Sequence, residues 1–106
     1  MSLPEAGASA TSTPLAERNG WKIALRGELD LASAPAVRPC FEEIIRRRPA
    51  CVVVDVSELS FMDSTGIALM LEAADQVPVL ELANPRPIIR AVMESMGLTE
   101  TLRIVP

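Results

Sequence analysis

The chain has 106 residues, of which 49% are hydrophobic and only 3% aromatic, and its formal net charge at pH 7 is −4. This acidic balance disfavours nucleic acid and anionic membrane surfaces as partners. The sequence contains no histidine, which excludes a Ser-His-Asp triad and a histidine-ligated metal site. No apolar run approaches the ~20 residues that are needed to span a bilayer, so we expect no membrane partner.

Reactive side chains are few. Lys22 is the only lysine and no glycine-rich phosphate loop is present, so we expect no enzymatic activity and no cofactor. The two cysteines, Cys40 and Cys51, show neither a metal-site spacing nor a disulfide framework, which indicates a reducing, cytoplasmic location. The composition therefore predicts a cytoplasmic protein without metal, cofactor or catalytic machinery.

The first part of the chain has weak structural signals. Residues 1–14 are rich in Ala, Ser, Thr, Gly and Pro and show no apolar period, so we expect a flexible leader before a single domain over residues 15–106. Asn19-Gly20 is a strong hairpin signal between residues 15–18 and the alternating strand 21–26. Pro14 confines the first strand of this hairpin to a sheet edge.

The remainder of the chain alternates between continuous apolar runs and apolar residues at helical spacing. The expected helices cover residues 34–48, 65–75 and 86–96, and the expected strands cover residues 51–56, 79–82 and 102–105. Strands that alternate with helices predict an α/β fold with right-handed crossovers. We expect a mixed sheet of four to five strands with about three helices packed on it and no C-terminal helix.

Polar residues follow several of these strands. Because the loops after parallel strands share one edge of a sheet, we expect Asp30, Asp63, Ser64 and Asn84 to lie at the same end of the molecule. Ser64 precedes a helix, where backbone N–H groups converge and the helix dipole favours negative charge. Its hydroxyl is therefore either a phosphate acceptor or simply a helix N-cap.

Several short motifs occur in order along the chain. They are GELD at residues 27–30, VVDVS at 53–57, FMDSTG at 61–66, NP at 84–85, IIR at 88–90 and MGL at 96–98. Any one of them is weak evidence, but the ordered set resembles a STAS domain of the anti-sigma factor antagonist family. The resemblance covers residues 15–106.

The resemblance implies a regulatory switch. In that family Ser64 would be phosphorylated by an anti-sigma factor with a GHKL-type serine kinase domain, and a Ser/Thr phosphatase would reset it. The unphosphorylated form would bind the kinase and free its sigma factor. The implied partner-binding residues are Asp30, Asp63, Ser64, Thr65 and Gly66. Read from the residues alone, Asp30 and Asp63 can also be helix caps and Gly66 a close-packing residue.

Two other functions are weighed against this one. The alternative is a STAS subunit of a lipid-transport ATPase complex, in which Ser64 is not phosphorylated and only caps a helix. A receiver domain that uses Asp55 as its phosphate acceptor is excluded, because no acidic pair follows the first strand and no lysine follows Lys22.

The chain also departs from the family pattern. The segment between Gly66 and the strand 79–82 is shorter than is typical, by about two helical turns, and residues 75–78 replace the usual glycine-rich turn. No C-terminal helix is expected after the last strand. We therefore expect uncovered apolar surface, closed either by a homodimer or by the partner.

Overall fold

A computed structural model of the protein describes residues 7–97 and 102–105. Within these residues five strands form one sheet, and their spatial order equals their order in the chain. The strands are β1 (Ala8–Leu15), β2 (Gly20–Leu29), β3 (Cys51–Met62), β4 (Val79–Ala83) and β5 (Arg103–Val105). β1 pairs with β2 antiparallel, and the other neighbours pair in parallel. The sheet is therefore mixed, as expected.

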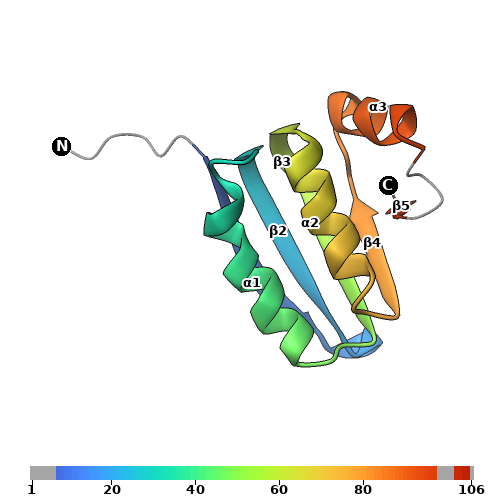
Figure 1. Ribbon diagram of the computed structural model, residues 1–106. Coiled ribbons are helices and arrows are strands. Elements are labelled where there is room, and N and C mark those ends of the chain that lie inside the picture. Colours follow the sequence, from blue (N-terminus) through green and yellow to red (C-terminus); the bar gives the residue numbers. More distant parts are fainter. Residues whose placement is uncertain (1–6, 98–101, 106) are drawn as a thin grey trace.

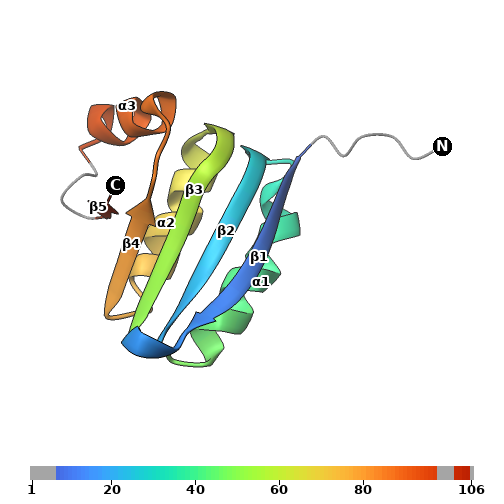
Figure 2. The same cartoon turned by 180° about the vertical axis from the view of Figure 1, so that it is seen from behind.

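Three helices follow the strands in alternation: α1 (Ala34–Arg46), α2 (Ser64–Ala74) and α3 (Pro87–Ser95). Figure 1 shows α1 and α2 in front of the sheet, and Figure 2 shows the opposite face without a helix over it. This one-sided cover follows from the strand order, because successive right-handed crossovers that step in one direction fall on the same face. α3 lies beyond the carboxyl end of β4 (Figures 1 and 2).

The hydrophobic core fills the space between the sheet and α1 and α2. Ile23 and Val54, which are partners in the register of β2 and β3, are fully buried on the helix side. Phe41 of α1 and Met70 of α2 are buried against them from above. Each belongs to the set of apolar residues at helical spacing that the sequence predicted on its helix.

The leader prediction is wrong for residues 8–14, which form most of β1; residues 1–6 lie outside the described part of the chain. Residues 15–18, expected as the first hairpin strand, are the last residue of β1 and the short 3-10 helix η1 (Ala16–Arg18). Asn19 takes a left-handed conformation before β2, so the turn lies where the sequence placed it. β1 was missed because backbone pairing, rather than an apolar alternation, holds its small polar residues in the sheet.

β2 and β3 are longer than expected. They continue past residues 26 and 56 to Leu29 and Met62, which are partners at the end of the ladder. The register shifts twice, between Ala24 and Arg26 and between Gly27 and Glu28, and each time β3 gains one residue over β2. Such bulges increase the local twist of the strands. The extension was not predicted because Gly27, Ser57 and Ser60, which lie in it, are residue types that favour turns.

The last helix and strand agree closely with the sequence. α3 ends at Ser95 with Met96 as its C-cap, and Gly97 follows with a φ of +69°, the left-handed conformation that commonly ends a helix. The final strand is confirmed over Arg103–Val105. Residues 98–101 lie outside the described part of the chain.

The open face of the sheet is polar and holds ion pairs near the start of the parallel strands. Glu81 of β4 is only 7% exposed, and its two carboxylate oxygens lie 2.9 Å from Arg18 Nη1 of η1 and 3.6 Å from Arg103 Nη1 of β5. The hydrogen bond from Arg18 lowers the pKa of Glu81, which burial opposes. Beside it, Lys22 Nζ lies 3.4 Å from Asp55 Oδ2. η1 and β5 are thus both joined to β4.

Candidate functional site

The candidate site lies where β2 and β3 end side by side. Leu29 and Met62 are the last partners of the ladder, and the N–H of Asp63 donates to the carbonyl of Leu29 at 3.1 Å. This bond brings the segment after β3 against the segment after β2. The expectation that Asp30, Asp63 and Ser64 share one end of the molecule therefore agrees with the structure.

Asn84 does not reach this group. β4 ends at Ala83, which pairs with Asp55, and Met62 lies seven residues further along β3. At 3.3 Å per residue that is about 23 Å. Asn84 instead has a φ of +57° and donates its N–H to the carbonyl of Val105. The sequence prediction is wrong here because β3 has twelve residues and β4 only five.

Asp63, and not Ser64, is the N-cap of α2. Its backbone is extended, and its Oδ1 accepts hydrogen bonds from the N–H groups of Thr65 at 2.9 Å and Gly66 at 3.3 Å. Ser64 is the first helical residue and its side chain is exposed. The capping interaction that could have occupied the Ser64 hydroxyl is therefore supplied by its neighbour.

Gly66 allows α2 to rest directly on the ends of the two strands. It is buried, and a Cβ at this position would lie 2.6 Å from Met62 Cγ and 2.9 Å from Leu29 Cγ. Side chains do not pack at such distances, so glycine fixes how closely the first turn of α2 approaches β2 and β3. The structure thus gives Gly66 a packing role, while Thr65 beside it is half-buried.

Asp30 fixes the start of α1. Its Oδ1 accepts from the N–H of Ser33 at 2.9 Å, and its own N–H donates to Ser33 Oγ at 2.9 Å. The same hydroxyl donates to the carbonyl of Glu28 at 2.6 Å. The buried Ser33 side chain thus both accepts and donates a hydrogen bond. Asp30 itself is half-buried. This reciprocal bonding fixes the loop that connects β2 to α1.

The charge around Ser64 is one-sided. Across residues 7–97 and 102–105, neither Asp30 nor Asp63 pairs with a lysine or arginine, although seven ion pairs form elsewhere. Both carboxylates accept hydrogen bonds from backbone N–H groups instead. The exposed hydroxyl of Ser64 therefore lies beside negative charge that no side-chain cation of the described residues neutralises.

Two apolar residues near the site were not singled out from the sequence. Leu31, which follows Asp30, is 76% exposed, and Phe61, two residues before Asp63, is 42% exposed. Large apolar side chains that are exposed singly are common on protein surfaces. Their signal in the sequence was weak, because each is a single apolar residue beside a polar motif.

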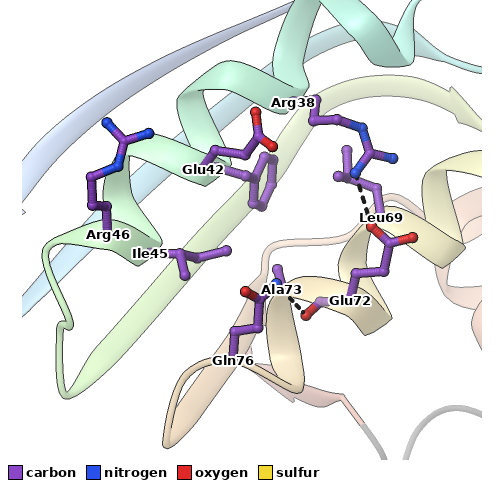
Figure 3. Close-up of a pocket in the computed structure, with 9 residues that line it drawn as sticks. Arg38, Glu42, Ile45, Arg46, Leu69, Glu72, Ala73 and Gln76 are labelled. Carbon is purple, nitrogen blue, oxygen red and sulfur yellow. Dashed lines mark hydrogen bonds and ion pairs between the residues drawn. The ribbon is translucent and has the colours of Figure 1, made fainter.

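A groove runs between α1 and α2 on the helical face (Figure 3). It has a volume of about 410 Å³ and combines apolar residues such as Phe41 and Leu69 with charged ones. Arg38 Nη1 of α1 and Glu72 Oε2 of α2 lie 2.8 Å apart across it, as the dashed line in Figure 3 marks. The ion pair joins the two helices through side chains that are both about half exposed.

The described residues offer no metal site, since no cluster of three or more His, Cys, Asp or Glu side chains is found among them. Burial raises the pKa of both thiols, Cys40 and Cys51. None of the helices described is both long and apolar enough to cross a membrane.

Comparison with known proteins supports the resemblance seen in the motifs. Residues 14–106 match the STAS domain family. The chain belongs to this family. The match begins at the end of β1 and includes the whole site around Ser64.

The relatives of this STAS domain are anti-sigma factor antagonists. Two sequences named anti-sigma-F factor antagonist RsfB, from the Mycobacterium tuberculosis strains CDC 1551 / Oshkosh and ATCC 25618 / H37Rv, are each 27% identical over 108 residues. The alignment covers 98% of this chain and 85% of each relative.

Solved structures show the same fold. An anti-sigma factor antagonist from Mycobacterium paratuberculosis superimposes with a TM-score of 0.87 at 19% identity, covering 100% of this chain and 91% of the other. SpoIIAA in its unphosphorylated form gives 0.75 at 25% identity, covering 92% and 89%. The phosphorylated form of SpoIIAA, a Bacillus cell fate determinant, gives 0.68 at 25% identity, covering 92% of each chain.

Proposed function

We propose that this STAS domain is a cytoplasmic anti-sigma factor antagonist whose binding is switched off by phosphorylation of Ser64. The unphosphorylated form binds an anti-sigma factor with a GHKL-type serine kinase domain and frees its sigma factor. The kinase transfers phosphate to Ser64 and the complex separates. A Ser/Thr phosphatase removes the phosphate and restores binding. The protein is then a substrate and a regulator, and it performs no catalysis itself.

The observation that carries this proposal is that Asp63 caps α2 and leaves the hydroxyl of Ser64 uninvolved in capping. Asp63 supplies the cap of α2, so the hydroxyl of Ser64 is exposed at the first helical residue. A kinase must reach this oxygen without unfolding the helix, and an exposed, uncapped position permits that. The fold is shared with SpoIIAA, which is known in unphosphorylated and phosphorylated forms.

We further propose that the partner binds the surface around Ser64. Asp30, Asp63 and Thr65 are each partly exposed beside it, so their side chains can contact a partner while they cap or pack locally. Gly66 is buried and contributes through the close approach of α2 to the sheet.

Electrostatics explains how one phosphate can end binding without refolding. Phosphoserine adds a charge of about −1.5 to −2 at pH 7. A like-charge pair about 6 Å apart costs about 2–3 kcal/mol at an effective dielectric constant near 20. Within the described part of the chain, neither Asp30 nor Asp63 has a paired cation to offset this cost, although the N-terminus of α2 offsets part of it in the free domain. Burial of the phosphate under an apolar or acidic partner surface removes water and increases the repulsion.

The proposal is tested by incubating the protein with a GHKL anti-sigma kinase and ATP and measuring its intact mass. We expect one added phosphate, which Ser64→Ala abolishes while kinase binding persists. Thr65→Val is the matched control, because it removes the neighbouring hydroxyl and should leave labelling unchanged. Undiminished labelling of Ser64→Ala would show that another residue is the acceptor.

A binding measurement separates the switch from the modification. Calorimetry with the same kinase should show weaker binding for Ser64→Asp than for wild type, with an unchanged unfolding temperature, because residue 64 is exposed. Equal affinities would show that charge at this position does not control the complex. Retained labelling with equal affinity would leave Ser64 a modification site without a switching role.

A further inference from the structure

Four large apolar side chains are exposed among the described residues, namely Leu31, Phe61, Ile88 and Met96. Ile88 belongs to α3 and Met96 is its C-cap, whereas Leu31 follows β2 and Phe61 lies near the end of β3. Leu31 is the most exposed of the four, at 76%. A single exposed apolar residue needs no explanation. What matters for Leu31 and Phe61 is how they are held and where they lie.

Leu31 is held at the tip of a hydrogen-bonded turn. The N–H of Ser33 donates to the carbonyl of Asp30 at 3.2 Å and to its Oδ1 at 2.9 Å, and the N–H of Ala34 donates to the same carbonyl at 2.8 Å. The N–H of Asp30 in turn donates to Ser33 Oγ. Leu31 and Ala32 lie between these bonded ends, and both are exposed. The turn is therefore pre-organised, so little backbone entropy is lost when a partner covers Leu31.

Chain geometry limits how far both side chains lie from Ser64. Phe61 is three residues earlier, so the two Cα atoms are at most about 11 Å apart. The carbonyl of Leu29 accepts the N–H of Asp63 at 3.1 Å. Leu31 is two residues beyond Leu29, so its Cα atom is at most about 18 Å from that of Ser64. A standard interface covers about 800 Å² of each partner, a disc about 16 Å in radius, and is large enough to include all three side chains.

The kind of surface that fits this area follows from the direction of the proposed switch. A cationic partner surface would pair with Asp30 and Asp63, but it would pair better still with phosphoserine at residue 64, which carries about −1.5 to −2 at pH 7. Phosphorylation would then strengthen binding. An apolar surface instead favours the neutral hydroxyl over the phosphate. Its approach to Asp30 and Asp63 costs less because one oxygen of each already accepts backbone N–H groups.

We propose that the anti-sigma factor kinase covers Leu31 and Phe61 with an apolar surface, and that burial of these two side chains holds the unphosphorylated complex together. The inference rests on the proposed function and adds the chemistry of the partner surface. Leu31 is fixed by its turn and Phe61 by the pairing of β3 with β2. Their burial therefore gains hydrophobic free energy without the ordering of a segment.

The test measures the dissociation constant of the full chain with the kinase that labels Ser64 in the mass experiment, with ADP in place of ATP. Leu31→Ser should weaken binding at least about tenfold, and Phe61→Ser should act in the same direction. The unfolding temperature of Leu31→Ser should not change, because residue 31 is exposed. Leu31→Met is the matched control, since it keeps a large apolar side chain and should bind within about threefold of wild type.

Salt dependence separates apolar from charged contact. Raising NaCl from about 0.05 to 0.5 M screens exposed ion pairs and leaves hydrophobic contacts in place. We expect the dissociation constant of the wild-type complex to change by less than about threefold over this range. A weakening of about tenfold or more would show that partner cations facing Asp30 and Asp63 hold the complex, and it would overturn the proposal.

Two outcomes separate this inference from the proposed function. If the kinase labels Ser64 but binds Leu31→Ser and Phe61→Ser as tightly as wild type, the apolar contact is refuted and the switch stands. If the kinase neither binds nor labels the wild-type chain, the proposed function fails and this inference fails with it.

Discussion

The two ends of the parallel strands differ in whether their carboxylates are paired with arginine side chains. Toward the amino end, the buried carboxylate of Glu81 is held by Arg18 and Arg103. At the carboxyl end, Asp30 and Asp63 accept backbone N–H groups and pair with no described cation, and Ser64 beside them is exposed. The chain neutralises its own charge where η1 and β5 close the sheet. It leaves charge unneutralised where we propose that a partner binds.

The largest expected effect is at the packing contact that supports the carboxyl end. Gly66→Val should lower the free energy of unfolding by about 1–3 kcal/mol, because the added side chain overlaps Met62 and Leu29. Urea denaturation measures this loss. Ser64→Ala, two residues earlier and exposed, is the control and should stay within about 0.5 kcal/mol of wild type. A Gly66→Val variant as stable as wild type would show that α2 can move away from the strands.

A smaller effect tests the cap. Asp63→Ala should cost about 1 kcal/mol of stability, because the N–H groups of Thr65 and Gly66 lose their acceptor. Asp63→Asn keeps an acceptor oxygen and removes only the charge, so it should retain most of this stability. If the two variants lose the same amount, the carboxylate acts through its charge and not as a cap.

The smallest effect concerns the amino end and depends on pH. Hydrogen bonding from Arg18 lowers the pKa of Glu81 from its ordinary 4.5, so its stabilisation is present above that value and is lost as the pH falls through the folded pKa. Glu81→Gln should cost less than about 1 kcal/mol at neutral pH, because both arginines are substantially exposed. The difference from wild type should shrink near pH 3. Denaturant unfolding at both pH values would reveal a constant difference if the pKa were not shifted.

The sequence predicted those parts of the fold that apolar periodicity determines. Val54 and Phe41 belong to patterns that can be recognised locally, and the motif at residues 61–66 placed Ser64 at the start of a helix. β1 could not be predicted in this way, because Ala10 and its small neighbours are held by backbone bonds to β2.

The site itself was only partly predictable. Whether Asp63 or Ser64 caps α2 depends on the φ and ψ angles at the end of β3, which neither side chain reveals. Asn84 was placed wrongly because β3 continues alongside β2 for seven residues beyond Asp55, its last partner in the pairing with β4. Leu31 and Phe61 were overlooked because exposure is a property of the folded surface.

The strand order has a consequence for how the chain folds. Each strand pairs with the one made immediately before it, so the sheet can grow one strand at a time as the chain leaves the ribosome. Every new pairing closes a loop no longer than one helix and its turns, which keeps the entropy cost of each step small. The addition of β5 differs from the earlier steps, because it also forms an ion pair with a residue that η1 contacts. β5 adds only three residues, but its Arg103 reaches Glu81, which Arg18 also contacts. Formation of β5 thus joins this strand to η1 through one shared carboxylate of β4.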